Sequence, residues 1–555
     1  MACKWFTRRT VLWGALASAP LVFAGPLALP VSGATLSNVK VEHVLLISVD
    51  GLHQQDLTTC FKAGTCPNIA ALASSGVNYT GAFTPGLSDS VPGLAALVTG
   101  GTPRTTGLFY DDVYDRTLYS GTDIACTGTQ GVEVFLQELV GIDAINGGAL
   151  VHLDGGGGFN PQQLPRRKLA NGQCIPVFPH DFIQTNTIFE VVRQNIPGAF
   201  TAWADKHAWG TDWVNGPSGS GVIDLARTEI NSLVPGQTFD YTHSIFTAQT
   251  FDNFHVQILL NQIDGKDSTN IVDPSQTPNQ IPVPMLFGTN FQTLSVAQKA
   301  LNKDGGGYTD ANFTPNTQVA QAITYVDGAI GKITAALDAK KLTKSTLIII
   351  TAKHGQTPVD YSTLKKIGHT EATALANFIG TGSDPITGNN LGTGQITDDD
   401  VAFIWLNSQG EVDAAVATLN SNKGCPPVDP ITKIITVANS TLICADTGGS
   451  VVKLASVPNK FGDPAKGRTP DIMIQPNPGV IYTKSTTKDA EHGGFAPTDS
   501  NVGLLVSHPQ LKQQTITTNV VTTQVAPTVL KALNLNPSLL NSVKVEGTQV
   551  LPNLF

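Results

Sequence analysis

An apolar run that ends in a single carboxylate constrains the fold of this 555-residue chain more than any other segment. Residues 44–49 read Val-Leu-Leu-Ile-Ser-Val and are followed at once by Asp50 and Gly51. A run of aliphatic and β-branched residues of this length is typical of a parallel strand that is buried on both faces. In open α/β sheets the ligand site lies beyond the carboxyl ends of such strands, so we expect Asp50 in a functional site, as a metal ligand.

Two later apolar runs carry an imidazole in a comparable place. Residues 345–351 lead to Lys353 and His354, and His492 lies within Glu-His-Gly-Gly shortly before the run 502–506. Taken singly, an Asp after a strand is usually a helix cap or a turn residue, and a His beside Gly is usually a loop residue. One Asp and two His residues, each near a Gly and a strand, together indicate a functional constellation.

Residues 88–101 predict a helix with a serine at its start. Pro92 suits the first turn and Gly100-Gly101 suits the end, which puts Ser90 near the N-cap. A hydroxyl there faces free backbone N–H groups and the positive end of the helix dipole, which stabilise an alkoxide and bind phosphate oxygens. Ser90 is therefore a candidate nucleophile. The alternative, which this segment alone favours, is that Ser90 only caps the helix.

The order of helix and strand patterns indicates an α/β fold. Five apolar residues at steps of four and three predict an amphipathic helix: Val319, Ile323, Val326, Ile330 and Ile333. This helix leads directly into the strand at 345–351, which is the order found in sheets covered by helices on both faces. We therefore expect a central, mostly parallel sheet with helices on both faces.

Two segments are interpreted as insertions into one enlarged domain at 35–555. Residues 110–280 are rich in Gly, Pro, Asn and aromatic residues and are expected to wall a pocket. Residues 367–467 contain a strand-like run at 400–406 and a helix-like run at 411–419, which predict a small α+β subdomain.

Four motifs in a fixed order give the chain a family resemblance. They are Val-Asp-Gly at 49–51, Ser-Val-Pro-Gly at 90–93 followed by Val-Thr-Gly-Gly, Ala-Lys-His-Gly at 352–355 and Glu-His-Gly-Gly at 491–494. In this order they resemble the alkaline phosphatase superfamily, and most of all its type I phosphodiesterase/nucleotide pyrophosphatase branch. The similarity runs from about residue 44 to 531. It implies an alkaline phosphatase-like fold and hydrolysis of phosphate esters.

The resemblance also implies a two-zinc centre beside a Ser or Thr nucleophile. Asp50, Ser90 and His354 match three ligands of one metal, and His492 matches a ligand of the other. Ser90 additionally matches the nucleophile. Two metals about 3.5–4 Å apart would activate the attacking oxygen and clamp the leaving oxygen.

Three of the family's ligands are replaced in this chain. The first residue of its Asp-His pair is Lys353 here, and a protonated lysine has no lone pair to offer zinc. Its Asp-x-x-x-His pair aligns with Gln292 and Val296, although Asp304 or Asp310 nearby could substitute. We therefore predict about one tightly held divalent ion rather than two. Lys353 is predicted to neutralise charge on the phosphate in place of the second ion.

A further polar cluster is expected to contribute to substrate binding. Asp205, Lys206 and His207 are consecutive, and in a strand Asp205 and His207 would share one face while Lys206 points away. The alternative is a solvated loop without a role in the site.

The first 34 residues are interpreted as a twin-arginine signal peptide. Thr-Arg-Arg-Thr-Val-Leu at 7–12 precedes an apolar stretch to residue 24, and the small residues at 32–34 suit cleavage. No other segment is long and apolar enough to suggest a membrane span. We therefore expect export to the periplasm or the extracellular space.

Cysteine usage agrees with export. Cys3 lies in the signal, and the six that remain are an even set without zinc-finger spacing, which favours disulfides over a metal site. Several connectivities are open. Short loops favour Cys60 with Cys66 and Cys425 with Cys444, which leaves Cys126 for Cys174.

The charge and the motifs leave three functions in play. A formal net charge of −9 argues against nucleic acid as a partner. The first function is hydrolysis of a small phosphate ester, either a diester or a monoester. The second is a binding protein that kept the pocket and lost the metals. The third is a transferase that passes the phosphoryl group from Ser90 to an alcohol.

Overall fold

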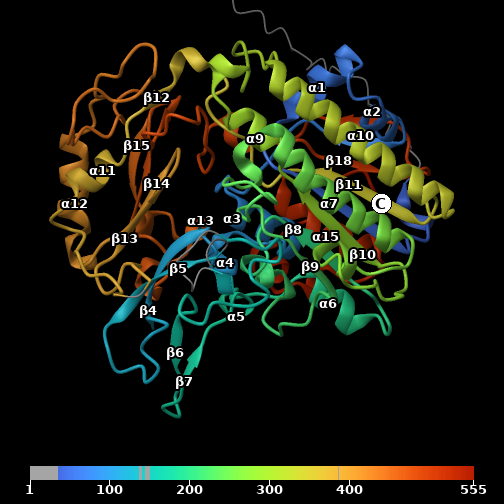
Figure 1. Cartoon of the computed structure of the whole chain (residues 1–555), viewed down its shortest axis with the longest axis horizontal. Coiled ribbons are helices and arrows are strands. Elements are labelled where there is room, and N and C mark those ends of the chain that lie inside the picture. Colours follow the sequence, from blue (N-terminus) through green and yellow to red (C-terminus); the bar gives the residue numbers. More distant parts are fainter. Residues whose placement is uncertain (1–34, 137–139, 144–149, 386) are drawn as a thin grey trace, which may run out of the picture.

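The computed structural model describes residues 35–136, 140–143, 150–385 and 387–555. The expected signal peptide at 1–34 lies outside these residues. Figure 1 shows an α/β body and, to its left, a smaller lobe that contains β13, β14 and β15.

An eight-stranded sheet forms the centre of the α/β body. Its strands, in spatial order, are β19 (Gln514–Ile516), β2 (Gly76–Tyr79), β18 (Leu505–Ser507), β11 (Thr346–Thr351), β1 (His43–Val49), β10 (Leu286–Phe291), β8 (Ala202–Asp205) and β9 (Asp224–Arg227). Strand β18 runs antiparallel to both neighbours, and the other pairs are parallel. The predicted, mostly parallel sheet is confirmed.

Helices cover both faces of this sheet. Successive side chains of the buried strand β1 point to opposite faces, and each face packs against helices in a core of its own. The larger helices of the body are α1 (Gln54–Ala63), α2 (Pro67–Ser74), α3 (Ser90–Thr99), α6 (Ile188–Asn195), α7 (Ile245–Ile263), α9 (Thr293–Lys299), α10 (Thr317–Ala339) and α15 (Val525–Ala532). Val44 and Leu46 belong to a core that includes residues of α3, α6 and α15. Leu45 and Ile47 belong to a core that includes residues of α1, α7 and α10.

The parallel pairing brings four sequence-distant side chains to one edge of the sheet. Asp50 follows β1, Gln292 follows β10, Lys206 follows β8, and Lys353 follows β11 by two residues. Strand β1 pairs with β10 on one side and with β11 on the other. The carboxyl ends of these strands therefore meet, which is where open α/β sheets place their ligands.

Two four-stranded sheets lie outside the central one. The first has the order β5 (Gln130–Phe135), β4 (Asp112–Tyr119), β6 (Arg166–Lys168), β7 (Cys174–Pro176). The second has the order β13 (Gln395–Asp398), β14 (Ala402–Trp405), β16 (Ile472–Gln475), β15 (Ser450–Lys453), and it shares a core with α12 (Val412–Ser421). The strand and helix expected near 400–406 and 411–419 are thus confirmed.

The segment expected as one insertion at 110–280 needs a correction. Its first part forms the separate sheet β5-β4-β6-β7, but β8 and β9 belong to the central sheet. Both strands have only four residues and lie in a Gly- and Pro-rich region, so no long apolar run marks them in the sequence.

Short elements connect these units. They are β3 (Ala82–Phe83), α4 (Pro103–Thr106), α5 (Pro179–Phe182), α8 (Thr269–Val272), β12 (Lys365–Lys366), α11 (Thr370–Ala374), α13 (Pro458–Phe461), β17 (Val480–Ile481), α14 (Pro497–Ser500), β20 (Val520–Val521) and α16 (Asn541–Glu546).

Three disulfides join the cysteines as predicted: Cys60 with Cys66, Cys126 with Cys174, and Cys425 with Cys444. Such bonds indicate an oxidising compartment. Among the residues that the structure describes, no helix has the length and apolar character needed to cross a membrane.

Candidate functional site

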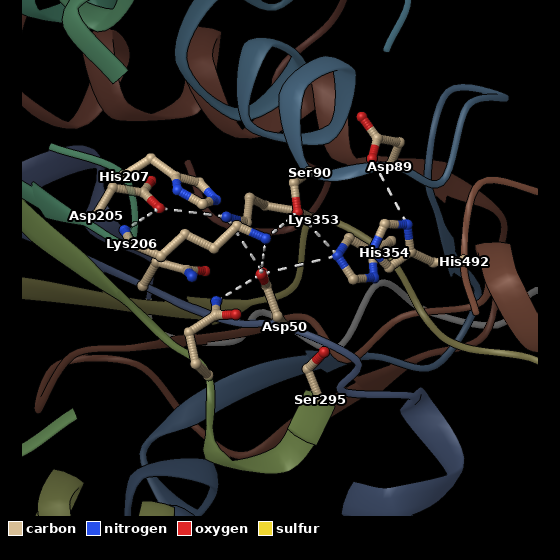
Figure 2. Close-up of polar contacts among 12 residues, drawn as sticks. Asp50, Asp89, Ser90, Asp205, Lys206, His207, Ser295, Lys353, His354 and His492 are labelled. Carbon is tan, nitrogen blue, oxygen red and sulfur yellow. Dashed lines mark hydrogen bonds and ion pairs between the residues drawn. The ribbon is translucent and has the colours of Figure 1, made fainter. Parts of the chain in front are cut away.

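Asp50 is the centre of the site and is completely buried. Gln292 Nε2 donates a hydrogen bond to its Oδ2 at 2.6 Å. Lys353 Nζ lies 3.3 Å from Oδ1, and Lys206 Nζ lies 3.5 Å from Oδ2 (Figure 2). Burial acts against a charge on Asp50, but the ammonium groups of Lys353 and Lys206 outweigh it and hold the pKa of this carboxyl below its ordinary value.

Ser90 is the first residue of α3, and the residue before it caps the helix. Asp89 Oδ1 accepts a hydrogen bond from the Val91 amide at 3.1 Å. The Ser90 hydroxyl is therefore free for other contacts. It accepts a hydrogen bond from Lys206 Nζ at 2.8 Å, and it lies 3.2 Å from His354 Nε2. The interpretation of Ser90 as a simple cap is wrong.

Gly93 explains why α3 can bring Ser90 so close to the loop after β11. A Cβ atom at this position would lie 2.3 Å from the carbonyl oxygen of Lys353, which is closer than real Cβ contacts. Glycine therefore permits the helix to pack on the backbone beside His354.

His354 is oriented by its own loop. Its Nδ1 lies 2.9 Å from the Gly355 carbonyl oxygen, which can only accept a hydrogen bond, so Nδ1 carries the proton. The Nε2 lone pair then faces Ser90. Burial is the largest influence on this imidazole and lowers the pKa of His354 to about 3, so the ring is neutral.

The second imidazole lies against the first. The rings of His354 and His492 have centroids 4.1 Å apart, and His492 Nδ1 lies 3.5 Å from Asp89 Oδ2. Burial lowers the pKa of His492 well below its ordinary value and raises the pKa of Asp89 to about 6. The site thus brings together all four residues expected as metal ligands.

The cluster after β8 is arranged differently from the prediction. The strand ends at Asp205, so strand alternation does not extend to Lys206, and both side chains point into the site (Figure 2). Asp205 Oδ1 lies 3.4 Å from Lys353 Nζ. His207 instead pairs with Glu229, with Nδ1 3.0 Å from Oε1. We call Asp50, Ser90, Asp205, Lys206, Lys353 and His354 the nucleophile cluster.

A second group of charges lies beside His492. Glu491 is paired with Lys299, 2.8 Å away, and with Lys488. Burial is the largest influence on the pKa of Glu491 and acts to raise it. The charges of Lys299 and Lys488 outweigh burial, so the pKa of this carboxyl lies below its ordinary value. We call Asp399, Glu491, His492, Lys299 and Lys488 the rim cluster.

A cleft of about 740 Å³ leads to both clusters. Three lysines line it, namely Lys206, Lys299 and Lys488, together with His492 and Gln292. Val296 and Asp304 also line this cleft, as do Asp240, His207 and the ring pair Phe239 and His243. A pocket that carries three ammonium groups suits an anionic ligand.

The side chains around Asp50 do not fit a divalent ion. Asp50 already contacts two ammonium groups, which cannot coordinate a metal, and Gln292 turns its NH₂ group toward the carboxylate. The possible substitutes do not help, since Asp304 pairs with Lys303, and Asp310 accepts hydrogen bonds within its own exposed loop.

Two groups among the described residues place three potential ligand atoms within 4.8 Å of one another. One is Asp399, Glu491 and His492 in the rim cluster, and the other is His369, Glu371 and Asp398, away from the nucleophile. The rim group contains the donor types that zinc accepts. However, Glu491 is already compensated by its two lysines.

Sequence reasoning missed the approach of Lys206 to Ser90 and the presence of Lys299 and Lys488. Lys299 lies at the end of α9 and Lys488 three residues before Glu491. No local pattern marks Lys206 or Lys299, because their long side chains reach the site only through the tertiary fold. The spacing of Lys488 to Glu491 was the one available signal.

Comparisons with known proteins agree with this architecture. The alkaline phosphatase PafA is 12% identical, with a TM-score of 0.53, and the match covers 90% of this chain and 96% of that protein. Murine ectonucleotide pyrophosphatase/phosphodiesterase 5 is 14% identical, with a TM-score of 0.48 and coverage of 89% and 96%. No curated protein sequence is significantly similar to the chain. The likeness to PafA shows an alkaline phosphatase-like fold.

A family model described as type I phosphodiesterase/nucleotide pyrophosphatase matches residues 44–137 and 194–499, which is more than half of the chain. These ranges contain the nucleophile cluster and the rim cluster. The chain therefore belongs to the type I phosphodiesterase/nucleotide pyrophosphatase family, and this family supports its assignment as a phosphoester hydrolase in general.

Proposed function

We propose that this protein hydrolyses small phosphate esters through a phosphorylated Ser90 intermediate. The observation that carries the proposal is the position of the Ser90 hydroxyl at the start of a buried helix, between Lys206 Nζ at 2.8 Å and the neutral His354 Nε2 at 3.2 Å. A nucleophile with a proton acceptor on one side and a fixed cation on the other is the arrangement that covalent catalysis requires.

In the first step, Ser90 Oγ attacks phosphorus and gives its proton to His354 Nε2. The bond from phosphorus to the leaving oxygen breaks, and the leaving oxygen keeps the electron pair of that bond. It then accepts a proton from water. In the second step, water attacks the phosphoserine and the bond from phosphorus to Oγ breaks. His354 returns its proton to Oγ, and the attacking water releases its second proton to solvent.

The cations around the cleft support an anionic substrate. Lys206 can stabilise negative charge on Oγ, and the helix N-terminus favours a phosphate beside Ser90. The cleft volume of about 740 Å³ suits a small molecule. The three disulfides support a site of action outside the cytoplasm, which agrees with the export expected from residues 1–34.

Hydrolysis of bis(4-nitrophenyl) phosphate and 4-nitrophenyl phosphate by Ser90→Ala tests this function. We expect a loss of at least about a thousandfold in kcat with the fold intact. Ser88→Ala is the matched control, because Ser88 is equally buried but its hydroxyl bonds to Thr84 at 2.8 Å. Near wild-type turnover by Ser90→Ala would refute the assignment.

Product analysis separates hydrolysis from the two alternatives. When an alcohol is added, a transferase would give a phosphate ester of that alcohol, whereas a hydrolase gives 4-nitrophenyl phosphate from the diester and inorganic phosphate from the monoester. A binding protein would retain phosphate esters in the cleft without turnover, and the replaced ligand positions at Lys353, Gln292 and Val296 are the observation in its favour.

A further inference from the structure

Lysine side chains lie near residues that match ligands of both metal ions of the family: two contact Asp50, and two act electrostatically on His492. Lys206 and Lys353 belong to the nucleophile cluster, and Lys299 and Lys488 belong to the rim cluster. We propose that these four ammonium groups replace two divalent ions, so that this chain cleaves phosphate esters without a metal. The proposal rests on the function proposed above, because it names the source of the positive charge for that reaction.

The charges of the nucleophile cluster are balanced within the protein. Lys353 Nζ lies 3.3 Å from Asp50 and 3.4 Å from Asp205, and Lys206 Nζ lies 3.5 Å from Asp50. Two ammonium groups thus face two carboxylates. A divalent ion held by Asp50 would meet both ammonium groups at close range, and like charges repel strongly in a buried site.

In the rim cluster, two ammonium groups contact a single carboxylate, that of Glu491. Lys299 lies 2.8 Å from Glu491, and Lys488 contacts the other carboxylate oxygen. The lysine side chains are 27% and 37% exposed and line the cleft, whereas that of Glu491 is 1% exposed. They can therefore meet phosphate oxygens directly.

The two lysines of the nucleophile cluster have different tasks. Lys206 donates to Ser90 Oγ and lines the cleft, so it is placed to touch both the nucleophile and the substrate. Lys353 is completely buried and is not part of the cleft wall among the described residues. We assign it as a positioning residue that holds Asp50 and Asp205, which corrects its expected place beside the phosphate.

Metal removal tests the proposal directly on the purified full chain. After dialysis against a chelator, elemental analysis should find less than about 0.1 ion per chain. Hydrolysis of bis(4-nitrophenyl) phosphate should stay within about twofold of the untreated rate. A loss of more than about tenfold that added zinc restores would overturn the proposal and leave the proposed function intact.

Lysine variants test the same claim without metal. In chelator-treated protein, Lys206→Met should lower kcat by about a hundredfold, and Lys206→Arg should recover part of the loss because it restores the cation. Lys453→Met is the control, since Lys453 pairs with Asp413 in the smaller lobe. Full activity of Lys206→Met without metal would overturn the role of its ammonium group.

A zinc titration decides the case even if the protein shows no hydrolysis. Isothermal titration of the wild type should detect no zinc site tighter than about 10 μM that depends on Asp50. Binding of zinc to the wild type that is lost in Asp50→Asn would overturn the proposal. Absence of hydrolysis together with absence of such binding would refute the proposed function and cleavage without a metal, and would support only the narrower claim that the lysines exclude a metal ion from Asp50.

Discussion

The nucleophile cluster and the rim cluster carry similar charges but hold them in different surroundings. Lys353 and Asp50 have fully buried side chains, and that of Lys206 is 12% exposed. On the rim, the lysine side chains are 27% and 37% exposed. Buried charges depend on their partners, because a charge left alone in the interior is costly, whereas exposed charges are screened by water and salt. The first cluster should therefore fix geometry, and the second should attract and hold the substrate.

The largest difference between the clusters should appear on removal of Lys353. Lys353→Met leaves Asp50 and Asp205 with less compensation in the interior, so the free energy of unfolding should fall by about 3–5 kcal/mol. Lys353→Asp should be worse, because it adds a third carboxylate. Denaturant unfolding measures the effect, with Lys353→Arg as the conservative variant. An unchanged midpoint for Lys353→Met would show that this lysine is not a buried counter-ion.

An intermediate effect is expected where the nucleophile cluster meets α3. Gly93→Ala adds a Cβ atom 2.3 Å from the Lys353 carbonyl oxygen, so α3 must shift and carry Ser90 away from His354. We expect about 1–3 kcal/mol of destabilisation and a fall in kcat of the folded protein. Gly328→Ala in α10 is the matched control, because no atom lies within 4 Å of its added Cβ. If both variants behave alike, close packing at Gly93 does not position the nucleophile.

The smallest effect should come from the rim. Lys488→Met should raise KM for the diester about threefold to tenfold at low salt, with a smaller difference at high salt, because an exposed charge is screened. Lys40→Met is the control, since the Lys40 side chain is 85% exposed and pairs with Glu42, and neither residue lines the cleft. Equal salt dependence of KM in wild type and Lys488→Met would argue against a role in binding the substrate.

Local patterns explain why much of the site was predictable. Asp50 and His354 follow long apolar strands, and Ser90 follows loop residues at the start of an apolar helix, so their places depend on short segments. Gln292 lies at the site, as its alignment after β10 suggested. Two disulfide pairs follow from short loops in the same way, and the pair of Cys126 with Cys174 is what these two leave.

The missed features depend on contacts between distant segments. Lys206 was expected to point away, because the prediction extended β8 two residues too far, to His207. Lys299 and Lys488 both pair with Glu491 although they lie on separate segments of the chain. No periodic sequence pattern predicts such a contact. Strands β8 and β9 were not predicted, because each has only four residues and lies in a Gly- and Pro-rich segment.

Mass spectrometry of Ser90 after an acid quench tests the central claim most directly. The chelator-treated protein is mixed with bis(4-nitrophenyl) phosphate, quenched during turnover and digested, and the peptide that contains Ser90 is analysed. Our account predicts that, without added metal, Ser90 carries a 4-nitrophenyl phosphoryl group, because only one nitrophenolate leaves in the first step, and that Ser90→Ala carries no such adduct. Phosphorylation that appears only after zinc is added, or that falls on another residue, would contradict it.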